Sequence, residues 1–445
     1  TLELWEHFRG LLNKEDLWDV WNLETDLLPC LVEMTERGIR FDVEQAERTK
    51  QELLKREKAM RKRIKELVGN DVEIWAAASI AKAFDKVGLS YPKTEKGSPS
   101  FTKNFLSDNP AELAQCIVKA RNLNKTQGSF IDGLIKHVAH DGRVHSHINQ
   151  VRGDRGGTVS GRISMNNPNM QQIPARDPEI GPMIRKLFLP EPGEKWAAID
   201  FSQQEPRILC HYAKVFGDFR KMDMPGVEEF VKEYNENPAT DFHSLVSKIS
   251  GLPRKTAKVI NLSLMYGMGV NKLSQQLDIP LEEAKELVKK YHKLVPFVKQ
   301  LTQGVQRHLE DPRSSGSIRS LKGRKCRFNL WEPDTFEMTK AMPYEEAVAA
   351  YGPTTRLKRA HTFKALNRLI QASAADMTKQ AMVDCYKSGK IPMLQVHDEL
   401  AFSVKDADEA KKLSDIMINA LKLVVPNKCD VEIGPNWGEY VEITE

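Results

Sequence analysis

The sequence predicts a mixed α+β protein in which short buried strands carry carboxylates and longer helices carry cations. Three apolar runs predict strands: 196–199 and the two runs that flank 397–399. Two longer stretches, 42–69 and 253–267, show the apolar spacing of helices. A chain of 445 residues also exceeds the usual size of a single hydrophobic core, so several subdomains are expected.

Composition narrows the class of protein without identifying it. Apolar residues make up 40% of the chain, and the formal net charge of +5 permits nucleic-acid binding without requiring it. The six cysteines show no C-x-x-C spacing, which argues against a zinc site or a disulfide framework and for a reducing compartment. No signal peptide and no apolar run of about 18 residues is found, so neither export nor membrane insertion is expected.

The first part of the chain is expected to be helical. Residues 1–23 are rich in tryptophan, and because the chain begins with Thr1 we interpret them as the end of a preceding segment of a longer protein. Residues 42–69 follow as a long amphipathic helix whose polar side is crowded with lysine and arginine. That basic side is either a solvated surface or a phosphate-binding one. A polar loop is expected at 90–104.

Two further stretches combine cations with glycine. Residues 151–174 are predicted to be a loop because several glycines alternate with arginines there. Glycine lets a backbone approach phosphates closely, although most such clusters are simply flexible loops. Residues 313–327 carry six cations and no acid, which fits binding of a nucleic-acid strand better than a solvated loop does.

A carboxylate follows the first predicted strand. Residues 196–199 are apolar, Asp200 comes next, and the polar sequence SQQEPR then leaves the sheet. A carboxylate at the exit of a buried strand is held rigidly and can serve as a metal ligand. Asp200 could equally start a turn or cap a helix, and this stretch alone leaves the two interpretations equally good.

The helix predicted between Pro253 and Gly267 presents cations on one face. One row of side chains spaced by four residues consists of Arg254, Lys258, Leu262 and Tyr266. The helix contains no acid, so two turn-spaced cations suit a polyphosphate, and the leucine and tyrosine suit a sugar or base. An ordinary basic surface helix is the alternative.

The second carboxylate lies at the tip of a predicted hairpin, 391–404. The tip sequence His397-Asp398-Glu399 lacks the glycine, asparagine or proline that a tight turn prefers. Function is expected to override propensity at such a place. Two carboxylates on strand ends, with a cationic helix between them in sequence, are the parts that two-metal phosphoryl transfer requires.

Four motifs in one order make the sequence recognisable. It resembles the polymerase region of family A DNA polymerases over residues 24–445, nearer the bacteriophage branch. DFSQQEPR (200–207) resembles motif A, RKTAKVINLSLMYG (254–267) motif B, QVHDEL (395–400) motif C, and 158–174 the minor-groove segment. The resemblance implies a right-hand polymerase fold with an antiparallel-sheet palm, helical fingers and a helical thumb.

The resemblance also implies a division of the chain. Residues 1–23 would be the remnant or tail of an exonuclease-like domain, without proofreading in this chain, and 24–150 the thumb with the start of the palm. The remaining ranges are the first part of the palm at 151–214, the fingers at 215–355 and the second part of the palm at 356–445.

Roles for single residues follow from the same resemblance. Asp200, Asp398 and Lys258 are the expected catalytic residues, and the aspartates would bind two Mg²⁺ ions, with Mn²⁺ as an alternative. The Phe201 carbonyl would add a ligand, and Glu399 would support the metal site. The expected nucleotide-binding residues are Gln203, Glu205, His243, Arg254, Lys258, Leu262 and Tyr266. The expected DNA-binding residues are Lys125, Arg162, Asn169, Gln171, Asn367, Gln371 and His397.

Two positions bear on which nucleotide is used. Glu205 stands at the family's steric-gate position, where a side chain blocks a ribose 2′-hydroxyl and so favours dNTPs. Leu262 departs from the family, which has Phe or Tyr there, and the smaller side chain should loosen packing beside the incoming sugar and base. Phe201 and Pro206 also depart from the usual Tyr and Leu, away from the chemistry.

The sequence therefore predicts an enzyme that adds dNTPs to the primer strand of primer–template DNA and releases pyrophosphate. A single-subunit RNA polymerase is one alternative, which Glu205 disfavours, and an inactive primer–template-binding scaffold is another. Reverse transcription of an RNA template stays open as a side activity. We expect a soluble, cytoplasmic monomer in a bacterial or virus-infected cell, away from membranes, with its processivity partner undetermined.

Overall fold

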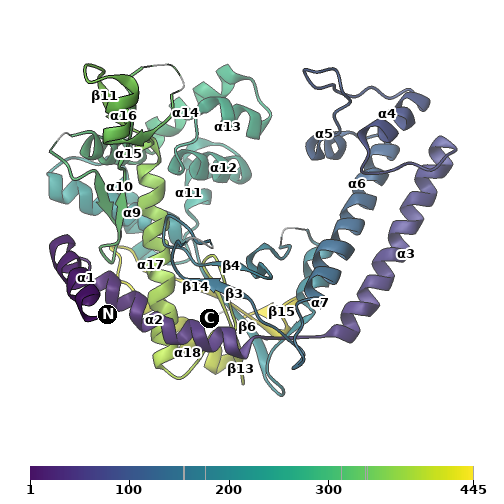
Figure 1. Ribbon diagram of the computed structural model, residues 1–445, viewed down its shortest axis with the longest axis horizontal. Coiled ribbons are helices and arrows are strands. Elements are labelled where there is room, and N and C mark those ends of the chain that lie inside the picture. Colours follow the sequence, from purple (N-terminus) through teal and green to yellow (C-terminus); the bar gives the residue numbers. More distant parts are fainter. Residues whose placement is uncertain (154–155, 176, 312, 336, 338, 444–445) are drawn as a thin grey trace.

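The computed structural model describes the whole chain except residues 154–155, 176, 312, 336, 338 and 444–445. A helical arm and a larger, mainly helical lobe rise like a U from a base that contains an antiparallel sheet (Figure 1). This arrangement confirms the predicted α+β right-hand fold. No helix in the described part of the chain is both long enough and apolar enough to cross a membrane.

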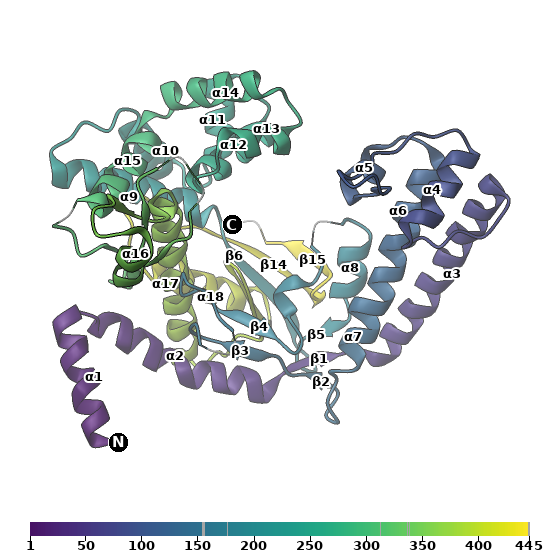
Figure 2. The same cartoon turned by 45° about the horizontal axis from the view of Figure 1, so that its top comes forward.

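The base is a five-stranded antiparallel sheet in the order β12–β13–β6–β14–β15 (Figure 2). Its strands are β6 (Lys195–Phe201), β12 (Leu394–Val396), β13 (Glu399–Val404), β14 (Cys429–Asn436) and β15 (Glu439–Glu442). The predicted apolar run 196–199 is buried throughout, which suits β6 to the middle of the sheet. The predicted hairpin is confirmed as well, since Val396 pairs with Glu399 across a turn of two residues.

Helices cover the sheet and join it to the lobe. The helices packed around this part are α2 (Trp18–Arg37), α17 (Ala365–Lys387) and α18 (Ala407–Asn419). A short 3-10 turn, η3 (Thr362–Lys364), leads directly into α17. Most of α17 is buried because α2 and α18 both pack against it, and even its Asp376 and Lys379 are inaccessible.

The arm is built on the predicted long helix α3 (Val43–Val68). The Asp42 side chain caps its start by accepting a hydrogen bond from the Gln45 amide, and Gly69 ends it in a left-handed conformation. It packs mainly against α6, and the other elements here are α4 (Ala77–Lys86), α5 (Lys103–Asp108), α6 (Glu112–Lys125), the π-helix η1 (Thr126–Asp132) and α7 (Gly133–Ile135). The arm has an apolar core of its own, which makes it a separate subdomain.

The lobe opposite the arm begins with α9, which starts within motif A and leads out of the sheet. Its helices are α9 (Gln204–Arg220), α10 (Val227–Glu236), α11 (Phe242–Ser250), α12 (Arg254–Met265), α13 (Val270–Leu277), α14 (Leu281–Leu294), α15 (Pro296–Glu310) and α16 (Tyr344–Tyr351). Its strands are β7 (Ser317–Arg319), β8 (Lys325–Arg327), β9 (Leu330–Pro333), β10 (Met342–Pro343) and β11 (Leu357–Arg359).

Small elements connect the arm to the sheet. They are β1 (Ile39–Phe41), β2 (Arg143–Val144), β3 (His147–Asn149), β4 (Ser164–Asn166), the 3-10 helix η2 (Met170–Gln172), α8 (Ile180–Arg185) and β5 (Phe188–Leu189). The prediction of a loop throughout 151–174 was wrong for β4 and η2. Strand β4 forms because it pairs with β3, a partner that the local glycine content does not reveal.

The N-terminal helices alter two expectations. The predicted boundary between residues 23 and 24 falls inside α2, one continuous helix. The preceding helix, α1 (Leu2–Glu15), has no buried residue. The basic stretch 313–327 forms the hairpin β7–β8 and faces these helices, because Arg319 donates to the carbonyls of Glu15 and Asp16.

Candidate active site

The predicted metal and nucleotide residues meet in one cleft between the central sheet and helix α12. The described residues that line it include Arg162, Asp200, Phe201, Gln203, Glu205, His243, Arg254, Lys258, Leu262, Tyr266, His397 and Asp398. They come from four segments that are far apart in the sequence. The fold therefore brings together all of the predicted nucleotide-binding residues and both predicted catalytic aspartates.

One aspartate lies on a strand, and the other lies in the turn that leads into the neighbouring strand. Asp200 is near the end of β6, and Asp398 lies in the turn between β12 and β13, which pairs with β6. The Phe201 amide donates a hydrogen bond to the Asp398 carbonyl at 3.3 Å, which ties the turn to β6. His397, exposed in the same turn, adopts φ 59°, so the turn sequence carries a backbone strain that its function must justify.

Negative charge is concentrated around Asp200. Its side chain reaches the cleft, but the surrounding protein and the nearby Asp398 and Glu399 raise its pKa. Burial is also the main reason that the pKa of Asp398 is raised, while Arg162 opposes that rise. Burial and mutual repulsion thus disfavour the ionised form of these carboxylates. A bound divalent cation would neutralise their charge and relieve the repulsion, so the site suits such an ion.

The donors available fit a hard cation such as Mg²⁺. They are carboxylate and carbonyl oxygens: Asp200, Asp398 and the adjacent carbonyl of Phe201. Within the described part of the chain, no group of three or more His, Cys, Asp or Glu side chains is arranged to hold a metal ion by itself. Mg²⁺ commonly binds through one or two carboxylates and completes its shell with water and substrate phosphates, so this donor set is sufficient.

Two further carboxylates flank Asp200 in the sheet. Glu399 of β13 and Asp430 of β14 are its partners on either side. Glu399 accepts a hydrogen bond from the Trp437 indole at 3.2 Å, and burial raises its pKa. Asp430 lines the cleft and pairs with Lys428 at 2.5 Å. Asp430 was not among the residues predicted from the sequence, although the alternation of polar and apolar residues at 430–433 was an available signal.

Helix α12 presents its cationic row to the cleft as predicted. Arg254, Lys258, Leu262 and Tyr266 all line it, while Ala257 and Ile260 are fully buried on the other side. Arg254 begins the helix and pairs with Asp241 at 2.5 Å. Asp241 also caps α11 by accepting hydrogen bonds from the amides of His243 and Ser244, so α11 and α12 are joined at the cleft.

His243 is held at the mouth of this pair of helices. It is 5% exposed, and its Nδ1 lies 2.9 Å from the side-chain nitrogen of Asn261, a fully buried residue of α12. Burial lowers the pKa of His243 to about 4. Gln203, which precedes α9, accepts a hydrogen bond from the Phe242 amide at 2.6 Å. Gln203 thus fixes the start of α11 against motif A.

Glu205 connects three of the predicted motifs. Its carboxylate pairs with Arg162 at 2.5 Å and accepts a hydrogen bond from the Tyr266 hydroxyl at 2.5 Å. Arg162 comes from the glycine-rich segment, Glu205 from motif A and Tyr266 from the end of α12. The side chain at the predicted steric-gate position is therefore held in place from both sides.

The other predicted DNA-binding residues lie outside the cleft lining. Lys125 is exposed at the end of α6. Asn169 caps η2 by accepting from the Gln171 amide, and the Gln171 side chain donates to the Gln395 side chain on β12 at 2.9 Å. Asn367 and Gln371 are half-buried near the start of α17. The minor-groove segment is thus linked to the strand that leads to Asp398.

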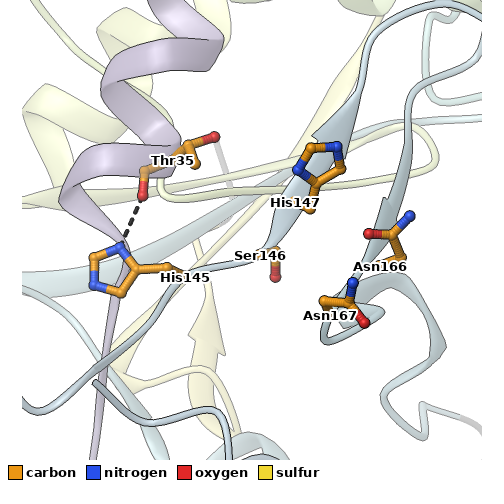
Figure 3. Close-up of a pocket in the computed structure, with 6 residues that line it drawn as sticks. All are labelled: Thr35, His145, Ser146, His147, Asn166 and Asn167. Carbon is orange, nitrogen blue, oxygen red and sulfur yellow. Dashed lines mark hydrogen bonds between the residues drawn. The ribbon is translucent and has the colours of Figure 1, made fainter. Parts of the chain in front are cut away.

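A separate hollow lies beside β3 and β4 and includes no predicted site residue (Figure 3). Its lining residues are Thr35, His145, Ser146, His147, Asn166 and Asn167. The Thr35 carbonyl lies 2.8 Å from Nδ1 of His145, which fixes the imidazole. A side chain at Gly38 would come within 2.7 Å of that ring, so the position requires glycine.

Comparison with known proteins gives a consistent result. Residues 43–439 match the family model described as DNA polymerase family A. A DNA-directed DNA polymerase from Pseudomonas phage M6 is 32% identical over 96% of this chain and 67% of its own length. DNA polymerase DpoZ from Acinetobacter phage SH-Ab 15497 is 30% identical, over 98% and 72% respectively.

Bacterial proteins and a solved structure agree with this. The thermostable DNA polymerase I of Thermus aquaticus is 29% identical over 98% of this chain, which spans 50% of that protein. The polymerase domain of Pol1 from M. smegmatis, solved with DNA primer–template and dNTP, has a TM-score of 0.77 and 26% identity over 98% of this chain and 74% of its own. The chain belongs to DNA polymerase family A and is a DNA-directed DNA polymerase.

Proposed function

We propose that this chain extends a primer on a DNA template by joining the primer 3′-oxygen to the α-phosphate of a dNTP, with pyrophosphate leaving. The observation that best supports this reaction is that the carboxylate pair, the cationic row of α12 and Glu205 all line one cleft. A structure similar to this chain contains DNA primer–template and dNTP, which supports the same partners here.

Asp200, Asp398 and the Phe201 carbonyl would hold two divalent cations, Mg²⁺ in the first place and Mn²⁺ as the alternative. When bound, such ions lower the pKa of the attacking hydroxyl and neutralise charge on the leaving phosphates. The protein holds Asp200 on β6 and Asp398 in the turn that leads into the paired strand β13, and the hydrogen bond from the Phe201 amide to the Asp398 carbonyl restricts their spacing. Glu399 supports the site through its position opposite Asp200 and its hydrogen bond to Trp437.

The nucleotide would lie along α12. Arg254 and Lys258 bind the triphosphate. Together with the neutral His243, they stabilise the negative charge that develops on it. Gln203 holds the segment that carries His243. Leu262 packs beside the sugar and base, and Tyr266 lies near the templating base. Glu205, held by Arg162 and Tyr266, excludes a ribose 2′-hydroxyl.

The duplex would lie between the arm and the lobe. In this proposal the arm is the thumb and the lobe the fingers, and the five-stranded sheet is the palm, divided by the fingers as the predicted ranges imply. The DNA contacts are Lys125, Arg162, Asn169, Gln171, Asn367, Gln371 and His397. Minor-groove acceptors occur on every base pair, so such contacts test pair shape without reading sequence.

Three finer points belong to the same proposal. The enzyme acts as a monomer. It acts in the cytoplasm of a bacterial or virus-infected cell, because its proposed DNA and dNTP substrates are found together there. RNA serves as a secondary template, because Leu262 leaves more room beside the nascent pair than an aromatic residue would. Sedimentation measures the oligomeric state, cell fractionation measures the compartment, and primer extension on an RNA template measures the use of RNA.

Primer extension tests the central proposal. The parent should extend a DNA primer with dNTPs and Mg²⁺, and Asp398→Asn should lower the rate by at least about 10³-fold, because each carboxylate is needed to hold the ions. Asp430→Asn is the matched control: it removes a carboxylate from the same sheet, but one that Lys428 already neutralises, and should cost less than about tenfold. Undiminished extension by Asp398→Asn would disprove the assignment.

A further inference from the structure

A groove on the outer side of the lobe has features of a nucleic-acid site that the catalytic cleft does not use. Two hollows adjoin there and share the residues Phe216, Arg220 and His308. Phe219 lines one of the hollows, and Lys221 and Arg307 line the other. We call this surface, formed by the end of α9, the middle of α15 and the hairpin β7–β8, the outer groove. In Figure 1 α9 and α15 lie in the lobe, on the side of the molecule opposite the arm helix α3.

Two phenyl rings stand in the outer groove. Phe219 is 80% exposed, more than any other large apolar side chain in the described part of the chain. The Phe216 ring lies on the bare backbone of α15, where a side chain at Gly304 would come within 2.5 Å of it. The Arg220 guanidinium lies 5.8 Å from the centres of both rings. Phe219 is exposed and Phe216 is half-buried against the core, so an exposed ring and the open part of a second ring lie beside an arginine and form a platform on which bases stack.

The cations of the outer groove are largely uncommitted. Among the described residues, no carboxylate lies within 4.0 Å of Arg220, Lys221 or Arg307, in contrast to Lys325 nearby, which pairs with Glu15 at 2.8 Å. The acidic residue of the lining, Asp311, is already engaged by Arg313 at 2.9 Å. The groove thus offers positive charge to a ligand and has little acid to repel phosphate.

Helix α9 links the outer groove to the catalytic cleft. It starts at Gln204, which lines the cleft, and ends at Arg220 in the groove. At about 1.5 Å per residue the two ends are roughly 24 Å apart. A strand that leaves the cleft could span this distance with several nucleotides.

We propose that the outer groove binds the unpaired 5′ part of the template strand, its bases stacking on Phe216 and Phe219 and its phosphates contacting Arg220, Lys221 and Arg307. This inference rests on the polymerase function proposed above. Charge decides the class of occupant. Uncommitted cations beside the exposed Phe219 and the half-buried Phe216 suit phosphate and bases, whereas a protein-binding surface of this kind would need an acidic partner.

The test measures how affinity depends on the length of the template overhang. Binding of a labelled primer–template is compared for overhangs of about 2 and about 12 nucleotides, the latter within the roughly 4–16 that single-strand grooves cover. The parent should bind the longer overhang at least about fivefold more tightly, the lower end of what one stacked base contributes. Phe219→Ala, and separately Arg220→Ala with Lys221→Ala, should abolish this preference.

The control removes equal charge elsewhere. Lys411→Ala with Lys412→Ala on α18 takes away two exposed cations and should keep the full preference. The groove variants should extend short-overhang substrates at the parental rate, since they do not touch the cleft. A photoreactive pyrimidine in the overhang should crosslink to the peptide that contains Phe216 and Phe219.

Two outcomes separate the proposals. If the parent extends primers but shows no preference for the longer overhang, the outer groove does not bind the template strand. The same holds if the groove variants keep the full preference, and a protein partner would then be the occupant to test. If the parent extends no substrate, the polymerase assignment itself fails.

Discussion

Glu205 shows how one side chain can join three motifs of the cleft. Its two carboxylate oxygens are each occupied, one by Arg162 and one by Tyr266, both at 2.5 Å. Charge-assisted hydrogen bonds of this kind are directional and strong. The carboxylate is thus oriented by protein before any nucleotide binds, which is what a residue that selects by shape requires.

Replacing Glu205 should change sugar selection. We expect Glu205→Ala to raise the use of rNTPs relative to dNTPs by about tenfold or more. The smaller side chain leaves space for a ribose 2′-hydroxyl, which therefore no longer clashes with residue 205. Single-nucleotide incorporation kinetics measure the ratio. Glu205→Gln, which keeps the volume, should stay much nearer the parent; an equal rise in both variants would point to charge instead.

Leu262 should set the tolerance for altered sugars. A phenyl ring at this position packs over more of the sugar and base, and such contacts add about 1 kcal/mol. We therefore expect Leu262→Phe to increase discrimination between dNTPs and dideoxynucleotides by about fivefold. Competition between the two in primer extension measures this. Unchanged selectivity would contradict the idea that Leu262 loosens the site.

His243 should make folding sensitive to acid. Its folded pKa of about 4 lies below the ordinary 6.5, so its contribution to stability is complete above pH 6.5 and is lost as the pH falls towards 4. Between pH 7 and pH 5 the free energy of unfolding should fall by about 2 kcal/mol from this group. Urea unfolding of the parent and of His243→Gln, each at pH 7 and at pH 5, checks this. The fall in the free energy of unfolding between the two pH values should be about 2 kcal/mol smaller for the variant than for the parent.

At the scale of elements, α2 and α17 are joined by buried charge. Lys379, 1% exposed, donates to Glu24 at 2.7 Å and to the Gln150 carbonyl at 2.9 Å. Arg324 of the basic hairpin bridges Glu24 and Asp376, at 2.5 and 2.8 Å. The cations predicted to meet a template strand are therefore partly used to hold the N-terminal helices to the palm.

Breaking this network should be costly. Lys379→Met is expected to reduce the free energy of unfolding by about 3 kcal/mol, because the largely buried Glu24 loses a partner that water replaces only in part. Lys387→Met is the matched control on the same two helices: its pair with Asp26 is about half exposed and should contribute under about 1 kcal/mol. Denaturant unfolding compares the two, and equal losses would contradict a role for burial.

At the scale of the whole molecule, the arm and the lobe face each other across the sheet, and the arm carries most of its lysines on its surface. Two lysines near η1 differ in one respect. Lys125 is exposed, whereas Lys50 pairs with Asp132 at 2.7 Å. Only a cation free of a carboxylate releases counterions fully when it meets a phosphate.

We expect Lys125→Ala to weaken primer–template binding on every sequence and to reduce the slope of log affinity against log salt by about 0.9. Lys50→Ala should leave the slope nearly unchanged. Titrations at several salt concentrations measure both. A smaller effect for Lys125 than for Lys50 would place the duplex elsewhere on the arm.

The sequence by itself determined the elements whose signals are local. The long helix of the arm could be predicted because Asp42 and Gly69 mark its ends, β6 because four apolar residues precede a carboxylate, and α12 because its cations repeat every four residues. Caps, apolar period and turn chemistry act over a few residues, so they can be read without knowledge of the fold. The family resemblance added which of these residues share one site.

Only the tertiary structure decided what depends on partners distant in the sequence. Asp430 joins the carboxylate cluster because β14 pairs with β6, β4 forms because β3 lies beside it, and the basic hairpin is occupied by the N-terminal helices. Ion pairs such as Lys379–Glu24 join residues 355 positions apart, and no local pattern encodes the partner of such a residue or of a strand. That is why the site's chemistry could be predicted from its motifs, whereas the contacts that hold Glu205, His243 and Lys379 in place could not.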